Sequence, residues 1–291
     1  MNKEKIPSTK HFIIIDGSYF IFHRYHSIKS WYKHAINNKV IPEEESKEID
    51  KETNKVGLSK EFIDKYIKTF HAKINELSKK LKINKNDEVI KIVGLDCPRK
   101  KIWRKKLYPD YKECRNESDD NVKDIFKLTY NNSLFNSSGI SYSLRHDLLE
   151  ADDVIAITTT YIQKKYPDAN VWIITSDMDY LQLSVPGRVM LYDLSYKDLT
   201  KKKNSSNDKK KDLFCKIVMG DKSDNIPPIF NKCGFKTAEK LYNDNEELMR
   251  RLNNDDKILN QYNLNKELID FNYIPEKYKD EFIKHCLEGK L

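Results

Sequence analysis

"HFIIID", residues 11 to 16, is a run of large apolar side chains that ends in a carboxylate and is followed by Gly17. Such a run predicts a strand buried on both faces of a sheet, with its carboxyl end open to a site. The same pattern recurs in "EVIKIVGLD", which ends at Asp96, and in "NVWIITSDMD", which ends at Asp177 and Asp179. The sequence therefore predicts buried strands that carry acids at one end.

Helical segments separate the expected strands. The clearest covers residues 59–82, where large apolar side chains recur every three or four residues, as on one face of an α-helix. Strands that alternate with helices predict an α/β fold, with a mainly parallel central sheet covered by helices. In such a fold ligands bind at the carboxyl ends of the strands, which is where these acids lie.

The composition indicates a folded, soluble protein. Its 291 residues, 38% of them hydrophobic, are enough to bury the core of one large domain or two modest ones. The five cysteines include no Cys-x-x-Cys pair and no zinc spacing, which indicates reduced thiols and an intracellular location. No apolar segment near the N-terminus is long enough for a signal peptide or a membrane span. The net charge of +8 weakly favours a polyanionic partner.

The stretch "LLEADDVIA" sets Glu150, Asp152 and Asp153 between apolar residues. If a helix begins near Glu150, then Glu150 and Asp153 share one face, with Asp152 beside them at a helix N-terminus, where negative charge is favoured. Helix capping would explain one or two of these acids. It fits a third acid poorly, so the stretch favours a functional site.

Two further pairs of acids follow along the chain. Asp177 and Asp179 project to one side if the chain is extended there, because side chains alternate along a strand. Asp221 and Asp224, in "MGDKSDNIP", are three residues apart and share one face of a helix. Taken singly, each pair is also explained by a surface turn or a capped helix.

A sheet that delivers these acids to one edge would build a self-repelling group of carboxylates, which cations must neutralise. Oxygen ligands without Cys or organised His select hard divalent ions, Mg²⁺ or Mn²⁺, and not zinc. Because Mg²⁺ is held by carboxylates together with substrate phosphates, the group predicts phosphate ester chemistry with two or more ions. The acids expected at this edge are Asp16, Asp96, Glu150, Asp152, Asp153, Asp177 and Asp179.

Five stretches of the chain, in order, resemble the 5′ nuclease family, which comprises 5′-to-3′ exonucleases and flap endonucleases of bacterial DNA polymerase I and of bacteriophages. They are "IIIDGSYFIFHRYH", "LDCPRKKIWRKKLYPDYKECR", "LLEADDVIA", "VWIITSDMDYLQL" and "MGDKSDNIPPIFNKCGFKTAEKLY", and they span about residues 11–242. The resemblance implies a PIN-like 5′ nuclease domain over residues 1–200, with a helical arch at about 98–135. It also implies a helical duplex-binding unit of the helix-hairpin-helix type over residues 212–291.

The resemblance assigns roles to individual residues. It implies that Lys112 and Arg104 are catalytic and that Tyr111 and Arg115 contact DNA in the arch. A Lys can offset charge on the scissile phosphate, and a Tyr offers a face on which an unpaired base can stack. The implied metal-binding acids are Asp16, Asp96, Glu150, Asp152, Asp153, Asp177, Asp179, Asp221 and Asp224.

The chain departs from the family at two places. The family has an Arg seven residues after its first Asp, where this chain has His23, and Arg24 is the expected replacement in DNA binding. The family's glycine-rich C-terminal hairpin, which contacts duplex DNA and a monovalent cation such as K⁺, keeps only one glycine here. Gly234 and Lys236 are the expected DNA-binding residues of this hairpin. Trp31, Trp103 and Trp172 are expected to be packing residues.

The sequence as a whole predicts a metal-dependent 5′-to-3′ exonuclease and structure-specific 5′-flap endonuclease of replication or repair. It would act as a monomer, away from membranes, on DNA with a 5′ flap or a free 5′ end, and on RNA-DNA hybrids. Two alternatives stay open: a catalytically silent flap-binding protein of this fold, and a PIN-like ribonuclease or phosphatase. The polar insertion at residues 35–58 receives no function, and the basic stretch at 201–212 is either a solvated hinge or a phosphate contact. A sliding clamp or a polymerase as partner is left open by the sequence.

Overall fold

The structure, a computed structural model, describes residues 9–37, 49–50, 55–56, 58–115, 120–203 and 205–291. At its centre lies a five-stranded sheet in the order β5-β4-β1-β6-β7, in which all neighbouring strands run parallel. This arrangement confirms the predicted α/β fold with a parallel central sheet. The strands are β1 (Lys10–Asp16), β4 (Glu88–Gly94), β5 (Tyr142–Leu144), β6 (Asn170–Ile174) and β7 (Val189–Tyr192).

The two faces of β1 explain the two layers of helices around the sheet. Phe12 and Ile14 point into one hydrophobic core, and Ile13 and Ile15 point into the other. All four side chains are fully buried, which is why the strand reads as an unbroken apolar run. The first core is closed by α6 (Ala151–Lys165), α11 (Glu276–Phe282) and the π-helical turn Ile283–Leu287. The second is closed by α1 (Gly17–Asn37), α2 (Lys60–Lys80), α4 (Asp120–Asn131) and α5 (Leu134–Ser137).

Helix α2 confirms the strongest helical prediction. Ser59 is its N-cap and accepts a hydrogen bond from the backbone N–H of Phe62 at 3.1 Å. The preceding polar insertion lies largely outside the described residues. Its described part is a short antiparallel pair, β2 (Ile49–Asp50) and β3 (Lys55–Val56).

A second group of helices lies beyond the edge strand β7. Their side chains form a separate hydrophobic core that contains Val218, Leu241 and Leu252. Among the described residues after Tyr192 the structure has no strand, as expected for a helical second unit. The boundary between the two expected units, 1–200 and 212–291, stays a prediction. Phe282 of α11, near the end of the chain, packs in the core beside the sheet. The group consists of α7 (Lys209–Met219), α8 (Phe235–Asn243), α9 (Asn245–Asn254) and α10 (Asp256–Ile269).

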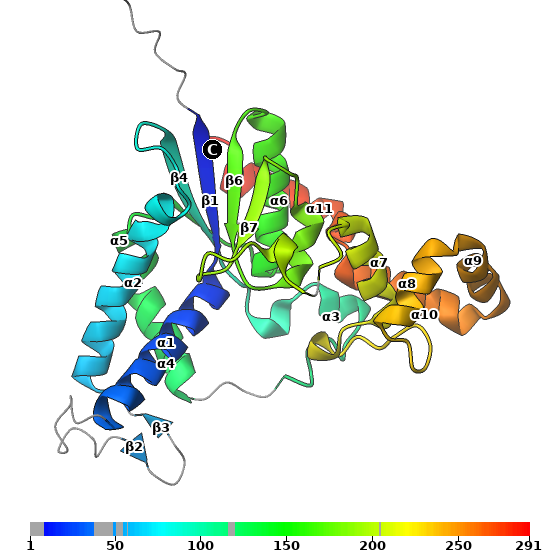
Figure 1. Cartoon of the computed structure of the whole chain (residues 1–291), viewed down its shortest axis with the longest axis horizontal. Coiled ribbons are helices and arrows are strands. Elements are labelled where there is room, and N and C mark those ends of the chain that lie inside the picture. Colours follow the sequence, from blue (N-terminus) through cyan, green and yellow to red (C-terminus); the bar gives the residue numbers. More distant parts are fainter. Residues whose placement is uncertain (1–8, 38–48, 51–54, 57, 116–119, 204) are drawn as a thin grey trace, which may run out of the picture.

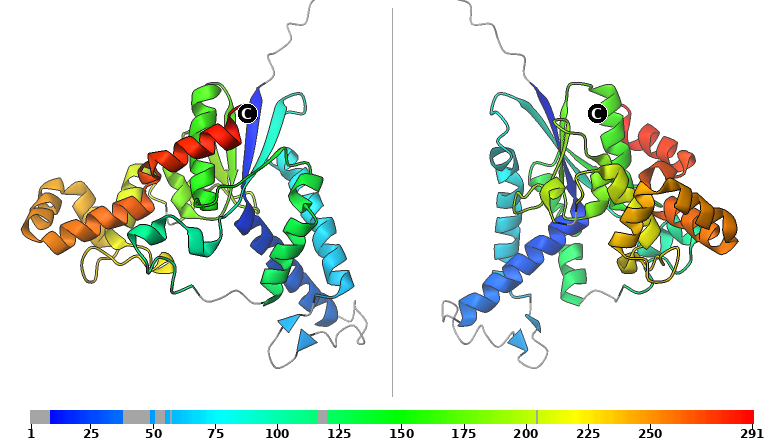
Figure 2. Two further views of the ribbon diagram at one scale, coloured as in Figure 1. Left: turned by 180° about the vertical axis from the view of Figure 1, so that it is seen from behind. Right: turned by 45° about the vertical axis from the view of Figure 1, so that its right-hand side comes forward.

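The predicted arch segment connects the two groups of helices. It begins with η2 (Arg99–Lys101) and α3 (Arg104–Leu107). Ile102 and Tyr111 of this segment pack against Ile217 and Leu268 of the second group. It returns as α4 beside α1, on the opposite side of the sheet's carboxyl edge (Figure 1). Residues 116–119 between these parts lie outside the described chain. Figure 2 shows α1, α2 and α4 on one side of the strand ends and α7 to α10 on the other. None of the described helices is long and apolar enough to cross a membrane.

Candidate metal centre

Two predicted acids lie at the carboxyl ends of neighbouring strands. Asp16 ends β1 and is 9% exposed; its carboxylate accepts hydrogen bonds from the Thr175 hydroxyl and the Tyr19 backbone N–H, both at 3.0 Å. Asp96 follows β4 and accepts a hydrogen bond from the backbone N–H of Ala151 at 2.8 Å. Burial, and then the charge of Asp96, raise the pKa of Asp16 to about 7. The parallel sheet therefore brings two acids 80 residues apart in sequence into electrostatic contact.

The start of α6 supplies three more acids. One carboxylate oxygen from each of Glu150, Asp152 and Asp153 lies within 4.8 Å of the others, as ligands of one ion would. Burial and then the neighbouring Asp153 raise the pKa of Asp152 well above its ordinary value. Burial alone would raise the pKa of Glu150 too, but Lys112 and Arg104 outweigh it and hold that pKa below the ordinary value. The predicted helix start at Glu150 is confirmed, because Glu150 is the N-cap residue.

Asp153 is turned into the protein. It is fully buried, and the Arg104 guanidinium donates to both of its carboxylate oxygens, at 2.8 and 2.7 Å. The indole N–H of Trp103 donates to it at 2.8 Å and the backbone N–H of Glu150 at 3.1 Å. Arg104, 2% exposed, also donates to the backbone carbonyl of Leu268 in α10, at 2.8 Å. These contacts fix the start of α6 against the arch and the second group of helices.

The arch brings three predicted residues over these acids. The Lys112 ammonium forms an ion pair with Glu150 and lies 3.6 Å from a carboxylate oxygen of Asp224. The Tyr111 hydroxyl lies 3.1 Å from both acids, and Arg115 forms an ion pair with Asp224. Lys112 has φ 59°, and its backbone N–H donates to the Asp224 carbonyl at 2.9 Å. This left-handed backbone directs the segment back toward the site.

The remaining acids form a third group around Lys216 of α7. The ammonium of Lys216 forms an ion pair with Asp179 and lies 2.9 Å from Asp221. Burial raises the pKa of Asp179 to about 6, against the opposing effect of Lys216 and with a further rise from Asp177. For Asp221 the ammonium outweighs burial, and the pKa falls to about 2. One lysine therefore offsets part of the repulsion between these carboxylates.

The local structure of the third group differs from the prediction. Asp177 and Asp179 are not on an extended strand, because residues Met178–Leu183 form the 3₁₀ helix η3. The Asp177 side chain caps this helix by accepting a hydrogen bond from the backbone N–H of Asp179 at 2.9 Å. Short polar side chains stabilise such turns, and this local hydrogen bond competes successfully with an extended backbone. Asp221 caps a similar 3₁₀ turn, Lys222–Asp224, and only Asp224 reaches Lys112.

Buried Tyr180 connects the groups of acids. Its hydroxyl lies 3.4 Å from Asp16. Burial, followed by the charges of Asp16, Asp152, Asp177 and Asp96, raises its pKa well above the ordinary value. Acids from four separate segments therefore act on one side chain. The structure gathers the predicted acids around a common region.

Three predicted DNA-binding residues make no bond to the described acids. Arg24, in α1, is half-buried, and burial lowers its pKa while nearby Glu76 and Tyr196 oppose the change. Gly234 and Lys236 are exposed at the start of α8. Gly234 has φ −104°, so its backbone does not require a glycine. Within the described chain, no hydrogen bond or ion pair joins these three residues to the acids.

Two residues of the site were missed by sequence reasoning. Lys216 lies 37 residues after Asp179, and only the packing of α7 on η3 brings them together. Trp103 was expected only to pack, but its indole N–H also supports Asp153. No local pattern marks either contact.

The donor set fits hard divalent cations. The clustered ligand atoms are carboxylate oxygens, the ligands that Mg²⁺ and Mn²⁺ prefer, and within the described chain no Cys or His belongs to the cluster. Burial is the main cause that raises the pKa values of Asp16, Asp152 and Asp179, and neighbouring carboxylates add to it, so a bound cation would favour their charged forms. A parallel α/β sheet with such acids at its carboxyl edge and basic residues above them is typical of metal-dependent phosphodiesterases.

Comparison with known proteins specifies the class further. The family model described as "5′-3′ exonuclease, N-terminal resolvase-like domain" matches residues 11–213. The chain therefore belongs to the 5′-3′ exonuclease family, which confirms the resemblance seen in the sequence. Ribonuclease H of enterobacteria phage T4 is 30% identical over 162 residues, which are 50% of this chain and 50% of that protein. The match thus spans about half the length of this curated relative.

Solved structures from bacteriophage T5 share the fold. The D15 protein co-crystallized with metal ions has a TM-score of 0.60 and 17% identity, over 94% of this chain and 97% of that chain. A T5 flap endonuclease variant, in a pseudo-enzyme-product complex with DNA and metal ions, has a TM-score of 0.59 and 16% identity over the same shares. At this identity the likeness establishes the common fold, including the parallel sheet.

Proposed function

We propose that the chain is a divalent-metal-dependent 5′-to-3′ exonuclease and 5′-flap endonuclease that hydrolyses phosphodiesters in DNA. One observation carries this proposal: Lys112 and Arg115 of the arch are held directly over acids from separate segments of the chain. Carboxylates bind the cations, and the basic side chains supply positive charge for a substrate phosphate. Membership of the 5′-3′ exonuclease family supports the same chemistry.

The metal ions would be Mg²⁺ or Mn²⁺, two or more of them. When bound, such ions lower the pKa of a coordinated water and stabilise the leaving oxygen. Asp16, Asp96, Glu150 and Asp152 would hold ions at the strand ends. Asp177, Asp179, Asp221 and Asp224 would hold ions toward the second group of helices. Asp153 is fully buried and pairs through both oxygens with Arg104, so it would position the start of α6 instead of serving as a direct ligand.

The basic residues would divide into two roles. Lys112 would stabilise the negative charge that develops on the phosphate, and Arg115 would bind the phosphate. Tyr111 is buried, so it would support Lys112 through their shared partners Glu150 and Asp224 instead of stacking on a base. Arg104 is buried beneath the acids, where the geometry favours a positioning role over the direct catalytic role expected from the sequence. Arg24, Gly234 and Lys236 would contact DNA outside the group of metal-binding acids.

The substrate would be DNA with a free 5′ end or a 5′ flap, bound by a monomer. The single strand would pass beneath the arch, and the helices after residue 212 would hold the duplex through its backbone. The chain would also cut RNA-DNA hybrids and bind K⁺ at the hairpin before α8. It would act inside the cell, in replication or repair.

A cleavage assay with three substrates tests the proposal. A labelled 5′-flap DNA, a single-stranded RNA and a generic phosphomonoester are each incubated with Mg²⁺, with Mn²⁺ and with a chelator. We expect metal-dependent cutting of the flap DNA, lost in Asp152→Asn. Tight flap binding without cutting under either ion would identify a silent binding protein. A preference for RNA or for the monoester would identify the other alternative.

A further inference from the structure

Four aromatic side chains form a continuous row across helices α1 and α4, which lie side by side (Figure 2). In α1 the rings of Phe22 and His26 are parallel to within 9°, with their centroids 6.3 Å apart. The ring of Phe126 in α4 meets that of Phe22 edge-on at 5.1 Å, and the ring of Tyr130 follows Phe126 at 6.1 Å. The aromatic row therefore passes from one helix to the other without a break.

The aromatic row is open to solvent. The side chains of Phe22 and Tyr130 are 37% and 40% exposed, and His26 is exposed as well. Single exposed hydrophobic residues are ordinary, but a contiguous group of them marks an interaction surface. The other sides of the two helices are buried, since Tyr25 of α1 and Ile125 of α4 belong to the core beside the sheet. The row is thus the solvent side of this pair of helices.

One end of the row lies beside the metal-binding acids. Burial, and then the charge of Asp96, raise the pKa of Tyr130 to about 12; Asp16 adds to the rise and Arg145 opposes it. Asp16 also directly precedes α1, and Phe22 lies less than two helical turns further on. Rings that begin at the acids and continue along α1 and α4 are placed to follow a substrate strand away from the site of cleavage.

Arg145 supplies positive charge at the same end of the row. It is exposed and directly follows β5, and no ion pair joins it to another described residue. Burial raises the pKa of the Cys97 thiol, next to Asp96, and Arg145 opposes this rise as it does that of Tyr130. An available guanidinium beside the acids and the rings suits a phosphate of a strand that enters the row.

The row offers what the arch tyrosine does not. Tyr111 was expected to present a face to an unpaired base, but it is 2% exposed and its hydroxyl lies 3.1 Å from both Glu150 and Asp224. A base stacks on a ring whose face is accessible. Exposure therefore favours Phe22 and Tyr130 for this role and excludes Tyr111.

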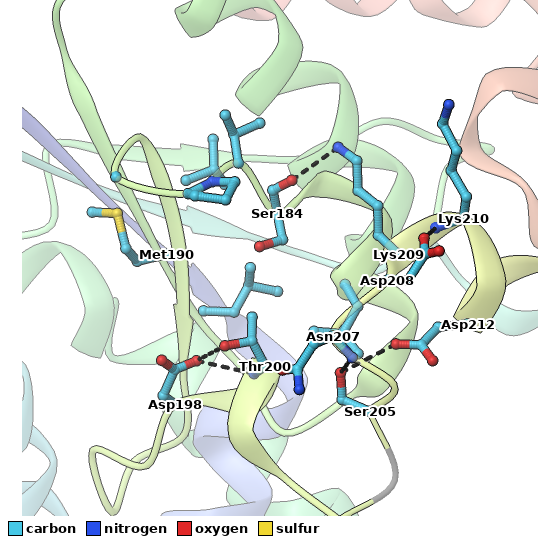
Figure 3. Close-up of a pocket in the computed structure, with 16 residues that line it drawn as sticks. Ser184, Met190, Asp198, Thr200, Ser205, Asn207, Asp208, Lys209, Lys210 and Asp212 are labelled. Carbon is cyan, nitrogen blue, oxygen red and sulfur yellow. Dashed lines mark hydrogen bonds between the residues drawn. The ribbon is translucent and has the colours of Figure 1, made fainter.

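The cavity of about 630 Å³ between β7 and the start of α7 offers no comparable surface (Figure 3). The described residues that line it include no aromatic side chain and no Arg, and their three Asp outnumber their two Lys. One of these lysines, Lys209, already donates to the backbone carbonyl of Ser184 at 2.8 Å. A single strand therefore finds aromatic faces along α1 and α4 but not at β7.

We propose that the aromatic row binds the unpaired 5′ strand of the substrate by stacking on its bases. The identity of this strand rests on the proposed nuclease function. Every base has a π face, so stacking adds affinity for the bases of a flap without requiring a particular sequence. A protein partner fits less well, because it would cover the approach to the metal-binding acids.

Removing the bases from the flap tests the proposal. Kd values are measured by fluorescence anisotropy in a chelator, so that binding is recorded without metal-dependent cleavage. Two DNA duplexes each carry a six-nucleotide 5′ flap, one of deoxyadenosines and one of abasic nucleotides that keep the phosphates. We expect the wild type to bind the deoxyadenosine flap about tenfold or more tightly than the abasic flap. Equal Kd values would overturn the proposal.

Variants of the row show where the bases bind. Tyr130→Leu and Phe22→Leu keep an apolar side chain but remove the ring, so each should raise the Kd for the deoxyadenosine flap several-fold and leave that for the abasic flap unchanged. Restoring a ring in Tyr130→Phe should recover tight binding of the deoxyadenosine flap.

Tyr273→Leu is the matched control. Tyr273 is also 40% exposed, but it lies in η6 (Phe271–Tyr273), and Phe271 packs in the core on the other face of the sheet. This variant should keep the wild-type ratio of the two Kd values. Losses of affinity in Tyr130→Leu that are equal for both flaps would assign the ring to the backbone or to packing and overturn the proposal. A wild-type chain that binds the bases but does not cut the flap with Mg²⁺ or Mn²⁺ would contradict the nuclease function alone.

Discussion

Arg104 and Asp153 form a buried two-point ion pair, in which Nη1 and Nη2 of the guanidinium lie 2.8 and 2.7 Å from the two carboxylate oxygens. The pair joins three parts of the molecule, because Arg104 begins the arch helix α3, Asp153 lies in the first turn of α6, and the same guanidinium reaches the Leu268 carbonyl of α10. The geometry of the acids at the start of α6 therefore depends on a buried contact between distant segments.

Breaking this pair should lower the free energy of unfolding. Arg104→Met leaves the Asp153 carboxylate buried with only neutral donors, so we expect a loss of about 3 to 5 kcal/mol in the free energy of unfolding. Asp153→Leu together with Arg104→Met removes both charges and should recover much of that loss. Urea denaturation of the wild type, both single variants and the double variant forms the necessary cycle. Additive effects of the two substitutions would refute a coupled pair.

Lys216 should stabilise the protein mainly when metal ions are absent. Its ammonium is the positive charge between Asp179 and Asp221, so Lys216→Met leaves these carboxylates to repel each other. We expect a lower Tm than wild type in a chelator, and a smaller difference once Mn²⁺ supplies positive charge at the same acids. Lys222→Met, an exposed neighbour in sequence, is the control. An equal loss of Tm with and without Mn²⁺ would show that Lys216 acts only through packing.

The sequence allowed much of this arrangement to be predicted, because parallel strands place their carboxyl ends at one edge. Apolar runs that end in an acid predicted β1, β4 and β6, and hence the positions of Asp16 and Asp96. The start of α6 followed from three acids ahead of an apolar run. These features depend on local patterns, which a single sequence contains.

Other features of the site depend on contacts between distant segments, or on a turn that competes with an extended strand, and these are harder to predict from one sequence. The bond between Trp103 and Asp153 spans 50 residues, and nothing in either neighbourhood indicates it. The turn at Asp177 is different, since an Asp side chain readily accepts a hydrogen bond from the backbone N–H two residues on, and this signal could have been weighed against strand alternation. The prediction that Trp31 packs is wrong: its side chain is 41% exposed, with the Lys65 ammonium 4.2 Å from its ring centre.

Asp16 should make the metal-free protein less stable as the pH rises. Its pKa is raised from 3.8 to about 7, so the folded state holds its proton more tightly than the unfolded state does. Its favourable contribution is complete below pH 4 and is lost as the pH rises to 7, by a few kcal/mol at about 1.36 kcal/mol per pKa unit. Other acids, such as Asp221 with its lowered pKa, act in the opposite direction at lower pH.

The substitution Asp16→Asn isolates this effect. Urea denaturation in a chelator, repeated from pH 4 to pH 8, gives the free energy of unfolding for the wild type and the variant. Because Asn does not ionise, the variant should lose less stability than the wild type between pH 4 and pH 7. Parallel curves for the two proteins would show that Asp16 titrates at an ordinary pKa.

Lys112 should contribute to cleavage more than to substrate binding. Burial opposes its charge, but Glu150 and then Asp224 outweigh burial and raise its pKa, so the ammonium stays protonated above neutral pH. A fixed positive charge beside the acids stabilises charge that develops on a phosphate in the transition state, and removing such a group costs about 100-fold or more in rate. We therefore expect Lys112→Met to lower the single-turnover rate on 5′-flap DNA by that factor while the Kd for the flap changes little. Lys100→Met, which removes an exposed lysine of the same segment, should leave the rate unchanged. A large rise in the Kd for Lys112→Met, with an unchanged rate at saturating enzyme, would assign Lys112 to binding instead of to cleavage.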